Sequence, residues 1–387
     1  MKAIWIRQWV GYGLLLSFLI LISCGPASEN NTESSLSADE DSDFYSQESA
    51  QTSVNTKLSK SIRPAKVTSS TTAKFKFSCT AGTCTYKCWL DANPWKKCKS
   101  PKTYTGLAEG AHSFKVKATN SQGQTDPSPA KYNWSIIFWT QISAGSNHTC
   151  GVRTNGTLWC WGRNFYGQLG DGTTVGLRKL PTQIGALNTW AEVSGGEEHT
   201  CGRKTDGTLW CWGMGNYGQR GDGTWDDQNV PTQVGLLNSW SAVNTGGMHT
   251  CGRKGDGTIW CWGGNQYGQL GDGTTVVARN TPTQVGALNS WAEIKAGGHH
   301  NCARKTEGTL WCWGYNPYGQ LGDGTTVNKN TPAQLGVDTT WTELYPGAYH
   351  NCAGKSDHSL WCWGYNKYGQ LGDGTTADKK TPIRVRQ

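Results

Sequence analysis

Five pairs of cysteines in the C-terminal part of the chain share one spacing, with nine residues between the two members of each pair. Thiol catalysis would need one cysteine in an environment of its own, whereas these pairs are equivalent. A β-hairpin with a three-residue loop would set the two cysteines opposite each other, at a distance that suits a disulfide. We therefore predict five structural disulfides: Cys150 with Cys160, Cys201 with Cys211, Cys251 with Cys261, Cys302 with Cys312, and Cys352 with Cys362.

Two other residue types recur at equivalent positions and could bind metal. A His precedes each cysteine pair (His148, His199, His249, His300, His350), and an Asp stands in each Gly-Asp-Gly-Thr motif (Asp171, Asp222, Asp272, Asp323, Asp373). Five His near one axis could form a metal ring, but a buried imidazole that bonds neighbouring backbone is the simpler interpretation. A calcium loop needs several oxygen ligands close in sequence, and the flanking glycines favour a turn-forming role for the Asp. We predict no metal site and no cofactor.

Residues that differ between the repeats are the better candidates for binding, because framework residues must repeat and binding residues need not. They lie before each His, after each Trp-Cys-Trp-Gly motif, and in the loop after Gly-Asp-Gly-Thr. Surface loops often carry function, and aromatic and Arg side chains are frequent hot spots. The candidates are Phe165, Glu197, Glu198, Trp225, Met248, Tyr315, Tyr349 and Tyr365. Neutral drift of solvated loops is the alternative explanation.

The acidic residues give little support for catalysis. A glycosidase needs two carboxylates at a defined separation in a cleft. The non-repeating acidic pairs, Glu197-Glu198 and Asp226-Asp227, are adjacent in sequence, which is a poor basis for such a site. We predict that the protein is not an enzyme and has no catalytic residue.

A repeated unit of about 50 residues must position these side chains. Trp-Cys-Trp-Gly occurs at 159–162, 210–213, 260–263, 311–314 and 361–364. In one unit, the pattern predicts short strands at 282–285, 291–295, 300–304 and 309–313, separated by Gly and Asn or Asp turns. Four strands in a unit of this length indicate a blade of a β-propeller.

The motif set resembles the regulator-of-chromosome-condensation repeat, in the Cys-rich form of exported bacterial proteins. The resemblance covers residues 139–387 and implies an all-β fold, which we predict to be a five-bladed β-propeller with four-stranded blades. The eukaryotic family usually has about seven blades, so five units depart from its pattern. We expect the ring to close by combining the first strand, at Trp139, and the last strand, at Pro382, in one blade. An arc completed by a second molecule is the alternative.

Residues 66–138 predict a second, smaller domain. Alternating strands and turn clusters indicate a small β-sandwich, and the stretch from Cys88 to Pro129 resembles the immunoglobulin-like repeats of bacterial envelope proteins. Its four cysteines allow three pairings. We favour Cys79 with Cys84 and Cys88 with Cys98, because each pair closes a local turn, and because an exported protein favours disulfides. A zinc site built from the four thiolates is the alternative.

The N-terminus has the features of an export signal. Lys2 and Arg7 precede an apolar run over 13–22 that is too short for a comfortable membrane span. The run ends in Leu-Ile-Ser-Cys, which resembles the lipobox of bacterial lipoproteins. The resemblance implies that residues 1–23 are removed and that Cys24 is acylated, which anchors the protein stably in a membrane. An ordinary signal peptide with a chance Cys is the alternative.

The segment that follows is polar. Residues 24–65 hold few apolar side chains, which predicts a disordered tether. Gly25 follows the lipidated Cys, where Asp would imply retention in the inner membrane, so the resemblance points to the outer membrane.

Composition excludes other classes. Charged residues make up 17% of the chain, with 51 Gly and 21 Trp, which argues against a helical bundle or coiled coil. The net charge is +8, and eleven basic against three acidic side chains lie in residues 66–138. Scattered lysines of this kind favour a solvated face, so we predict no nucleic-acid partner.

These observations predict a lipid-anchored binding protein of the bacterial cell envelope, either periplasmic or exposed on the surface. Loops on one propeller face would bind a protein or a glycan. The alternative is inhibition of an extracytoplasmic enzyme, since some exported bacterial propellers of this repeat family inhibit β-lactamases. Nucleotide exchange, the role of the eukaryotic family, needs a cytosolic or nuclear GTPase and does not suit an exported chain.

Overall fold

The computed structural model describes residues 53–386. The predicted signal segment 1–23, the predicted lipidation site Cys24 and most of the predicted tether lie outside the described residues. All regular elements between residues 53 and 386 are β-strands, and none of these residues forms a helix that could cross a membrane. The strands fall into two sets along the chain, β1–β9 and β10–β29.

The first set forms a small β domain. Its strands are β1 (Thr56–Leu58), β2 (Val67–Thr68), β3 (Ala73–Phe75), β4 (Phe77–Cys79), β5 (Cys84–Leu90), β6 (Lys96–Cys98), β7 (Lys102–Tyr104), β8 (Gly110–Asn120) and β9 (Ala130–Ile136). Five of them form one sheet in the order β2-β9-β8-β5-β6, while β1 pairs with β4 and β3 pairs with β7. The two small pairs contribute to the same hydrophobic core as the large sheet.

Buried side chains that face this core alternate along β8 with side chains that face the solvent. Phe114 is buried and stacks on Phe75 of β3, with ring centroids 4.0 Å apart. Lys115 points to the opposite face, as successive residues in a strand do, and its ammonium lies 4.3 Å from the ring centroid of Trp89. The next lysine on that face, Lys117, covers Trp95 in the same way. These lysines therefore form part of a solvated outer face.

The prediction of a single tether over residues 24–65 is wrong for its last part. β1 pairs with β4, and the backbone amide of Thr56 donates a hydrogen bond of 2.7 Å to Asp126. The Tyr132 hydroxyl donates to the carbonyl oxygen of Pro64. The segment joins the domain through backbone pairing, which its polar composition did not reveal.

The second set forms five four-stranded antiparallel sheets, the blades, each built from a continuous stretch of chain. Blade 1 holds β10 (Trp139–Ala144), β11 (His148–Arg153), β12 (Leu158–Arg163) and β13 (Leu177–Gln183). Blade 2 holds β14 (Trp190–Gly195), β15 (His199–Lys204), β16 (Leu209–Gly213) and β17 (Gln228–Gln233). Blade 3 holds β18 (Trp240–Thr245), β19 (His249–Lys254), β20 (Ile259–Gly264) and β21 (Ala278–Gln284).

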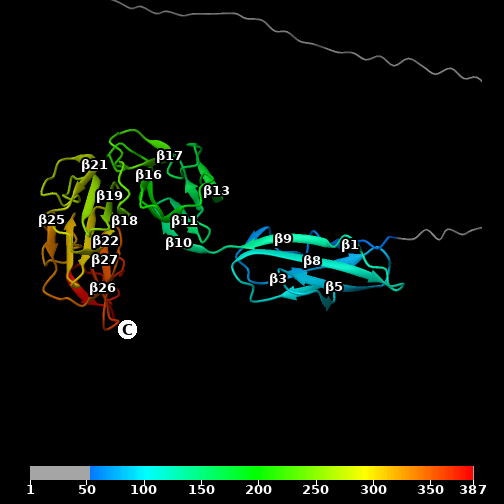
Figure 1. The fold of residues 1–387 in the computed structure, drawn as a ribbon. Helices are drawn as coiled ribbons and strands as arrows, with labels where there is room; N and C mark the ends of the chain where they lie inside the picture. Colours follow the sequence, from blue (N-terminus) through cyan, green and yellow to red (C-terminus); the bar gives the residue numbers. More distant parts are fainter. Residues whose placement is uncertain (1–52, 387) are drawn as a thin grey trace, which may run out of the picture. The chain divides into compact units, whose positions relative to one another are not determined.

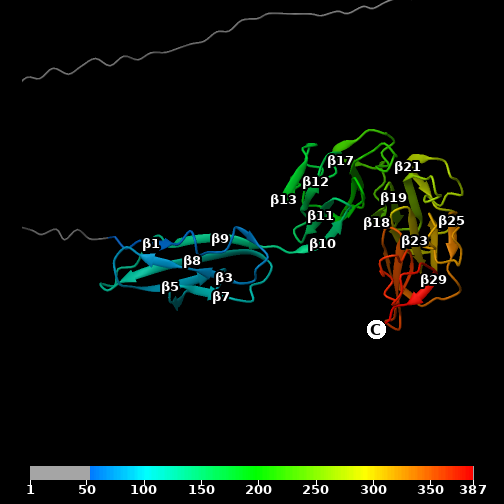
Figure 2. The ribbon, with the colours of Figure 1, turned by 180° about the vertical axis from the view of Figure 1, so that it is seen from behind.

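Blade 4 holds β22 (Trp291–Ala296), β23 (His300–Lys305), β24 (Leu310–Gly314) and β25 (Lys329–Gln334). Blade 5 holds β26 (Trp341–Pro346), β27 (His350–Lys355), β28 (Leu360–Gly364) and β29 (Lys379–Arg384). Figure 1 shows the blades following one another from green to red, and Figure 2 shows the same succession from behind. Consecutive blades are therefore neighbours in space as well as in sequence.

Each blade follows the same local rules. Its second and third strands form a hairpin, in which Cys251, for example, stands opposite Cys261. The hairpin turn of this blade contains Gly257 at φ 82°, where a Cβ atom would lie 2.1 Å from the carbonyl oxygen of Asn289. The fourth strand carries a proline in every blade, which an edge strand tolerates because one side of it donates no ladder hydrogen bond.

The predicted grouping of strands into blades is wrong. The proline strand pairs with the Trp-Cys-Trp strand that precedes it, as in the register of Trp159 with Gln183. The last strand, β29, likewise pairs with β28, and β10 begins a blade that β13 completes. The long loop after Trp-Cys-Trp-Gly returns the chain to the same sheet, so no blade combines the two ends of the repeat region.

Four junctions between consecutive blades repeat one interface. A His of each blade contacts a Thr or Asn of the next: His148 with Thr200 (2.7 Å), His199 with Thr250 (2.9 Å), His249 with Asn301 (3.0 Å) and His300 with Asn351 (3.1 Å). A hydrophobic core shared by the two blades also lies at each of these junctions. Between blades 3 and 4, Ile259 and Val285 pack against Trp291, Ile294 and Trp313. The step from blade to blade is therefore set by the same side chains each time.

The prediction of a complete five-bladed ring is also wrong for this structure. Within residues 53–386, no hydrogen bond joins blade 5 to blade 1. Ile142 of blade 1 is 56% exposed, whereas its equivalents in the other four blades are buried. Leu360 of blade 5 is 42% exposed, although its equivalents are also buried. The two terminal blades thus each keep one face of the repeated interface unpaired within the described residues.

Candidate functional site

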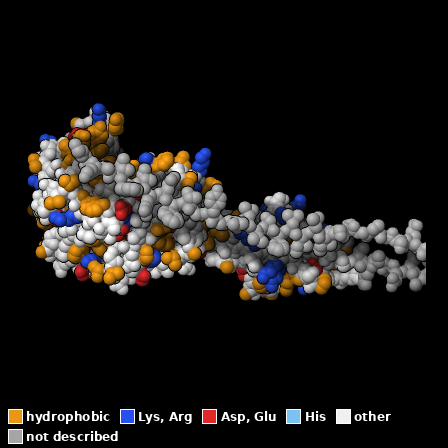
Figure 3. All heavy atoms as spheres, turned by 90° about the horizontal axis from the view of Figure 1, so that it is seen from above, with side chains coloured by type: hydrophobic (Ala, Val, Ile, Leu, Met, Phe, Trp, Pro, Cys, Tyr) orange, Lys and Arg blue, Asp and Glu red, His pale blue; other side chains and the backbone are white. Residues whose placement is uncertain are grey.

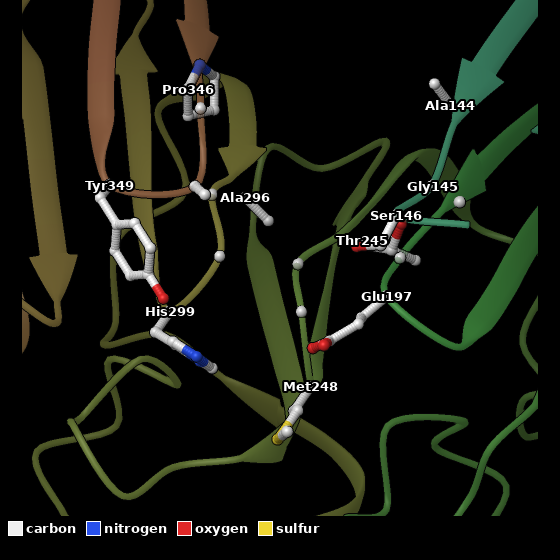
Figure 4. A pocket seen from close by; sticks show the side chains of 18 residues that line it. Ala144, Gly145, Ser146, Glu197, Thr245, Met248, Ala296, His299, Pro346 and Tyr349 are labelled. Atoms are coloured by element: carbon white, nitrogen blue, oxygen red, sulfur yellow. The ribbon is translucent and has the colours of Figure 1, made fainter. Parts of the chain in front are cut away.

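The loops between the first and second strands of all five blades meet around a central pocket. This pocket has a volume of about 460 Å³ and is lined by residues 144–146, 195–197, 245–248, 296–299 and 346–349. Glycines dominate the loops because the blades approach one another closely there. A Cβ atom at Gly246 would lie 2.6 Å from the carbonyl oxygen of Gly297 in the next blade. The small residues leave room for the few larger side chains that enter the pocket (Figure 4).

Glu197 and His299 face each other across the central pocket, with Met248 below them and the hydroxyl end of Tyr349 turned toward His299 (Figure 4). Burial lowers the pKa of the His299 imidazole, and the nearby Glu197 carboxylate offsets this only in part. The Nδ1 atom of His299 is buried and has no hydrogen-bond partner among residues 53–386. In the same part of the chain, Glu197 forms no ion pair. The pocket therefore holds a carboxylate without an ion-pair partner among residues 53–386, beside an imidazole whose charged form is disfavoured by burial.

Glu198 behaves differently from its neighbour, although the sequence made them one candidate pair. Its side chain is buried, forms an ion pair with Arg163 and accepts a hydrogen bond from Gln168. Burial raises the pKa of the Glu198 carboxyl, and the Arg163 guanidinium opposes the shift. Glu198 thus connects blades 1 and 2 through bonds to protein groups.

Six tyrosines and His299 form a continuous aromatic surface across blades 3 to 5, which we name the tyrosine band. Its members are Tyr267, His299, Tyr315, Tyr318, Tyr349, Tyr365 and Tyr368. Ring centroids lie 4.5 Å apart for Tyr267 and Tyr315, and 4.9 Å apart for Tyr318 and Tyr365. Burial, together with the neighbouring tyrosines, raises the pKa of Tyr315. Because His299 and Tyr349 also line the central pocket, band and pocket form one surface.

The repeated cysteines, histidines and aspartates belong to the framework. Seven disulfides join Cys79 with Cys84, Cys88 with Cys98, Cys150 with Cys160, Cys201 with Cys211, Cys251 with Cys261, Cys302 with Cys312, and Cys352 with Cys362. Each repeated His but the last contacts a side chain of the next blade, where we expected a backbone partner. No three His, Cys, Asp or Glu residues between 53 and 386 are arranged to hold a metal ion.

The Asp of Gly-Asp-Gly-Thr closes a local turn. Asp171 accepts hydrogen bonds from the backbone amide and the hydroxyl of Thr173, at 3.0 Å and 2.7 Å. Its other oxygen accepts a bond of 2.8 Å from Arg178. Burial by itself would raise the pKa of Asp171, but these hydrogen bonds and the guanidinium charge lower it. The carboxylate is thus committed to protein groups.

The RCC1-like domain model matches residues 119–387. The chain belongs to the RCC1-like domain family. The ultraviolet-B receptor UVR8 of Arabidopsis thaliana is 33% identical over 210 residues, which cover 53% of this chain and 47% of the receptor. The chain thus matches about half the length of this curated relative and less of others.

Solved RCC1-like structures share the fold. Human WBSCR16 matches with a TM-score of 0.58 and 18% identity, over 79% of this chain and 94% of that one. Yeast RCC1, in its complex with Kap60, matches with a TM-score of 0.58 and 17% identity, over 79% of this chain and 84% of that one. They support repeated four-stranded blades of the RCC1 propeller, which has about seven blades rather than five.

Within the RCC1-like blades, the predicted binding residues do not form one group. Tyr315, Tyr349 and Tyr365 belong to the tyrosine band, while Glu197 and Met248 line the central pocket. Phe165 and Trp225 are exposed, at 57% and 48%, on blades 1 and 2, and neither ring stacks on the band. Arg163 lies 5.2 Å from the ring centroid of Phe165.

Sequence reasoning missed four members of the band. Tyr267, Tyr318 and Tyr368 lie in a Tyr-Gly-Gln sequence that recurs in every repeat, as framework residues do, and His299 was not among the predicted binding residues. A usable signal exists in the sequence. Only blades 4 and 5 combine a tyrosine directly after Trp-Cys-Trp-Gly with the motif tyrosine three residues later.

Proposed function

We propose that this chain is a non-catalytic binding protein whose RCC1-like propeller holds a protein ligand on the tyrosine band. The observation that carries the proposal is the band itself, a row of adjoining aromatic rings that continues into a pocket. Tyr349 and Tyr368 are 39% and 82% exposed. Tyrosine offers a large contact area with few rotatable bonds and a polar tip, which makes it a frequent anchor of protein interfaces.

Outside the tyrosine band, and apart from the unpaired faces of blades 1 and 5, the exposed apolar side chains of the described propeller are distributed over several blades. Other exposed apolar side chains, such as Leu180, Leu236 and Val337, lie on separate blades. Hydrophobic side chains in Figure 3 are scattered in small groups among polar ones. Single exposed apolar residues are normal on a protein surface, so these positions do not indicate a second site.

A protein ligand agrees with one structural relative, since yeast RCC1 was solved with Kap60 bound. We also propose export and anchoring through Cys24, on the lipobox resemblance. Seven disulfides suit an oxidising compartment. We propose in addition that the first domain is an immunoglobulin-like spacer. Inhibition of an exported enzyme is the second candidate function, with the enzyme as the protein ligand on the tyrosine band.

The test compares capture by three forms of the full chain. The first is wild type, the second carries Tyr318→Ala, Tyr349→Ala and Tyr365→Ala, and the third carries Leu180→Ser, Leu236→Ser and Val337→Ser as a matched control. Each is immobilised and exposed to detergent-solubilised envelope proteins of the cells that produce it, and in parallel to purified envelope glycans.

We expect a protein that wild type and the control retain equally and that the tyrosine variant loses. Truncating three adjoining hot-spot tyrosines should weaken binding by more than about 100-fold. Equal retention by the tyrosine variant, with unchanged circular dichroism, would contradict the proposal. Capture of glycan alone would assign the band to a different ligand and would also contradict it.

A further inference from the structure

We infer that the central pocket binds a cationic side chain, a Lys ammonium or an Arg guanidinium, which the protein ligand on the tyrosine band inserts. The inference rests on the proposed function and specifies its ligand. Its basis is the juxtaposition in the pocket of a free carboxylate with aromatic rings.

The charges around the central pocket favour a cation. Glu197 is the one acidic side chain among the residues that line the pocket, and none of them is Lys or Arg. The guanidinium of Arg163 is already paired with the adjacent Glu198. An apolar group placed here would bury the Glu197 carboxylate without a partner, which is costly, and an anion would be repelled. A cation removes both penalties.

Aromatic rings complete the site. Tyr349 lines the pocket, and His299 lies with its ring centroid 5.6 Å from that of Tyr267 and 6.2 Å from that of Tyr315. The faces of aromatic rings attract ammonium and guanidinium groups within about 6 Å of the centroid. The propeller already uses this interaction elsewhere, since Lys254 lies 3.6 Å from the ring centroid of Trp260. A carboxylate opposite aromatic rings is therefore a suitable environment for a long cationic side chain.

The size and position of the central pocket allow a long side chain to enter it. A volume of about 460 Å³ lies toward the lower end of the range for small-molecule sites. His299 and Tyr349 belong to both the pocket and the tyrosine band, so a ligand lying on the band has direct access. The glycine-rich loops approach one another too closely for larger residues, as the clash of a Cβ at Gly246 with Gly297 shows. Their small size keeps the space free for an entering group.

The test uses small probes in place of the unidentified ligand. The amides of Nα-acetyl-lysine, Nα-acetyl-arginine and Nα-acetyl-norleucine are titrated against the full chain and followed by ligand-observed NMR. We expect saturable binding of the two cationic probes and at least about tenfold weaker binding of the norleucine probe, because it lacks the charge. Equal binding of all three would overturn the inference.

Three variants locate the site. Glu197→Gln, which keeps the shape of the side chain, should weaken the cationic probes by about tenfold or more. Met248→Lys, which supplies a cation inside the pocket, should abolish their binding. Glu307→Gln, the matched control on an exposed hairpin turn, should change nothing. An unchanged affinity of Glu197→Gln would overturn the inference.

Probe binding and protein capture together separate this inference from the proposed function. If the band still captures a protein while no cationic probe binds, the cation site is wrong and the binding role of the band stands. If Tyr318→Ala, Tyr349→Ala and Tyr365→Ala leave capture unchanged, the proposed function itself is wrong.

Discussion

Neighbouring side chains in this protein have opposite roles, and the clearest case is Glu197 and Glu198. Glu197 lines the central pocket without an ion-pair partner among the described residues, whereas Glu198 is buried against Arg163 and Gln168. Both residues lie in the loop between β14 and β15, where the first side chain enters the pocket and the second enters the contact between blades. Removing each side chain should therefore have a different effect.

Arg163→Ala should lower the free energy of unfolding by roughly 2 kcal/mol, because it leaves the Glu198 carboxylate buried without its partner. Glu197→Gln should change it by less than about 0.5 kcal/mol, since that carboxylate has no protein partner to lose. Urea denaturation followed by tryptophan fluorescence measures both. A larger loss for Glu197→Gln than for Arg163→Ala would contradict the assigned roles.

The buried histidines make stability depend on pH. Burial lowers the pKa of His148, His249 and His300 from 6.5 to about 4, and that of His199 to about 3. Between pH 6.5 and pH 4 the unfolded chain binds more protons than the folded one at these positions. Their contribution to stability is therefore complete above about pH 6.5 and is lost as the pH falls toward 4. We expect the melting temperature to decrease over this interval.

A variant isolates the effect of one histidine. Burial raises the pKa of Glu192, Glu198 and Glu293, which acts in the opposite sense, so the overall slope is a sum. His300→Gln retains an amide that can bond Asn351 but cannot be protonated. It should reduce the slope of the unfolding free energy by up to about 1.4 kcal/mol per pH unit between pH 6.5 and pH 4. An unchanged slope would mean that His300 is protonated in the fold.

At the scale of elements, the hairpin of the second and third strands organises each blade. Its disulfide lies at directly opposed positions and its cysteines enter the core between blades. In blades 1 to 4 these cysteines are fully buried, whereas Cys79, Cys84 and Cys352 are partly exposed. Access of a thiolate to the sulfur controls the rate of reduction, so burial should rank the seven disulfides.

Limited reduction with dithiothreitol, followed by alkylation and peptide mass spectrometry, checks this ranking. We expect Cys79–Cys84 to be reduced first and Cys352–Cys362 before the other blade disulfides. The disulfides of blades 1 to 4 should react only when the propeller unfolds. Simultaneous reduction of all five blade disulfides in the native protein would show that burial does not protect them.

At the scale of the whole molecule, the unpaired faces of blades 1 and 5 are the main departure from a closed propeller. Equivalent positions in different blades differ in exposure: Ile142 of blade 1 is 56% exposed, while Val243 of blade 3 is 1% exposed. Val243→Ser should therefore destabilise the protein by about 2–4 kcal/mol, and Ile142→Ser by less than about 0.5 kcal/mol. Thermal unfolding at several protein concentrations measures both. An equal loss for Ile142→Ser would show that blade 1 is covered in solution.

Local features could be predicted from the sequence by itself. Spacing alone predicted four strands per unit, and it favoured cysteine partners that the structure joins, because both depend on residues within one hairpin. Alternation of apolar residues predicted strands in the first domain for the same reason. Composition misplaced residues 56–65, since backbone pairing of a polar segment leaves no apolar pattern.

Only the tertiary structure decided what lies between blades. Strands β29 and β10 look like two halves of one blade in sequence, yet each completes its own sheet, because the loop length determines which edge the proline strand reaches. The tyrosine band draws Tyr267, Tyr315 and Tyr349 from three blades, about 50 residues apart along the chain. Spacing within a repeat is set by local hydrogen bonds and chirality. Contacts across repeats depend on the angle between blades, which cannot be predicted from any single segment of the chain.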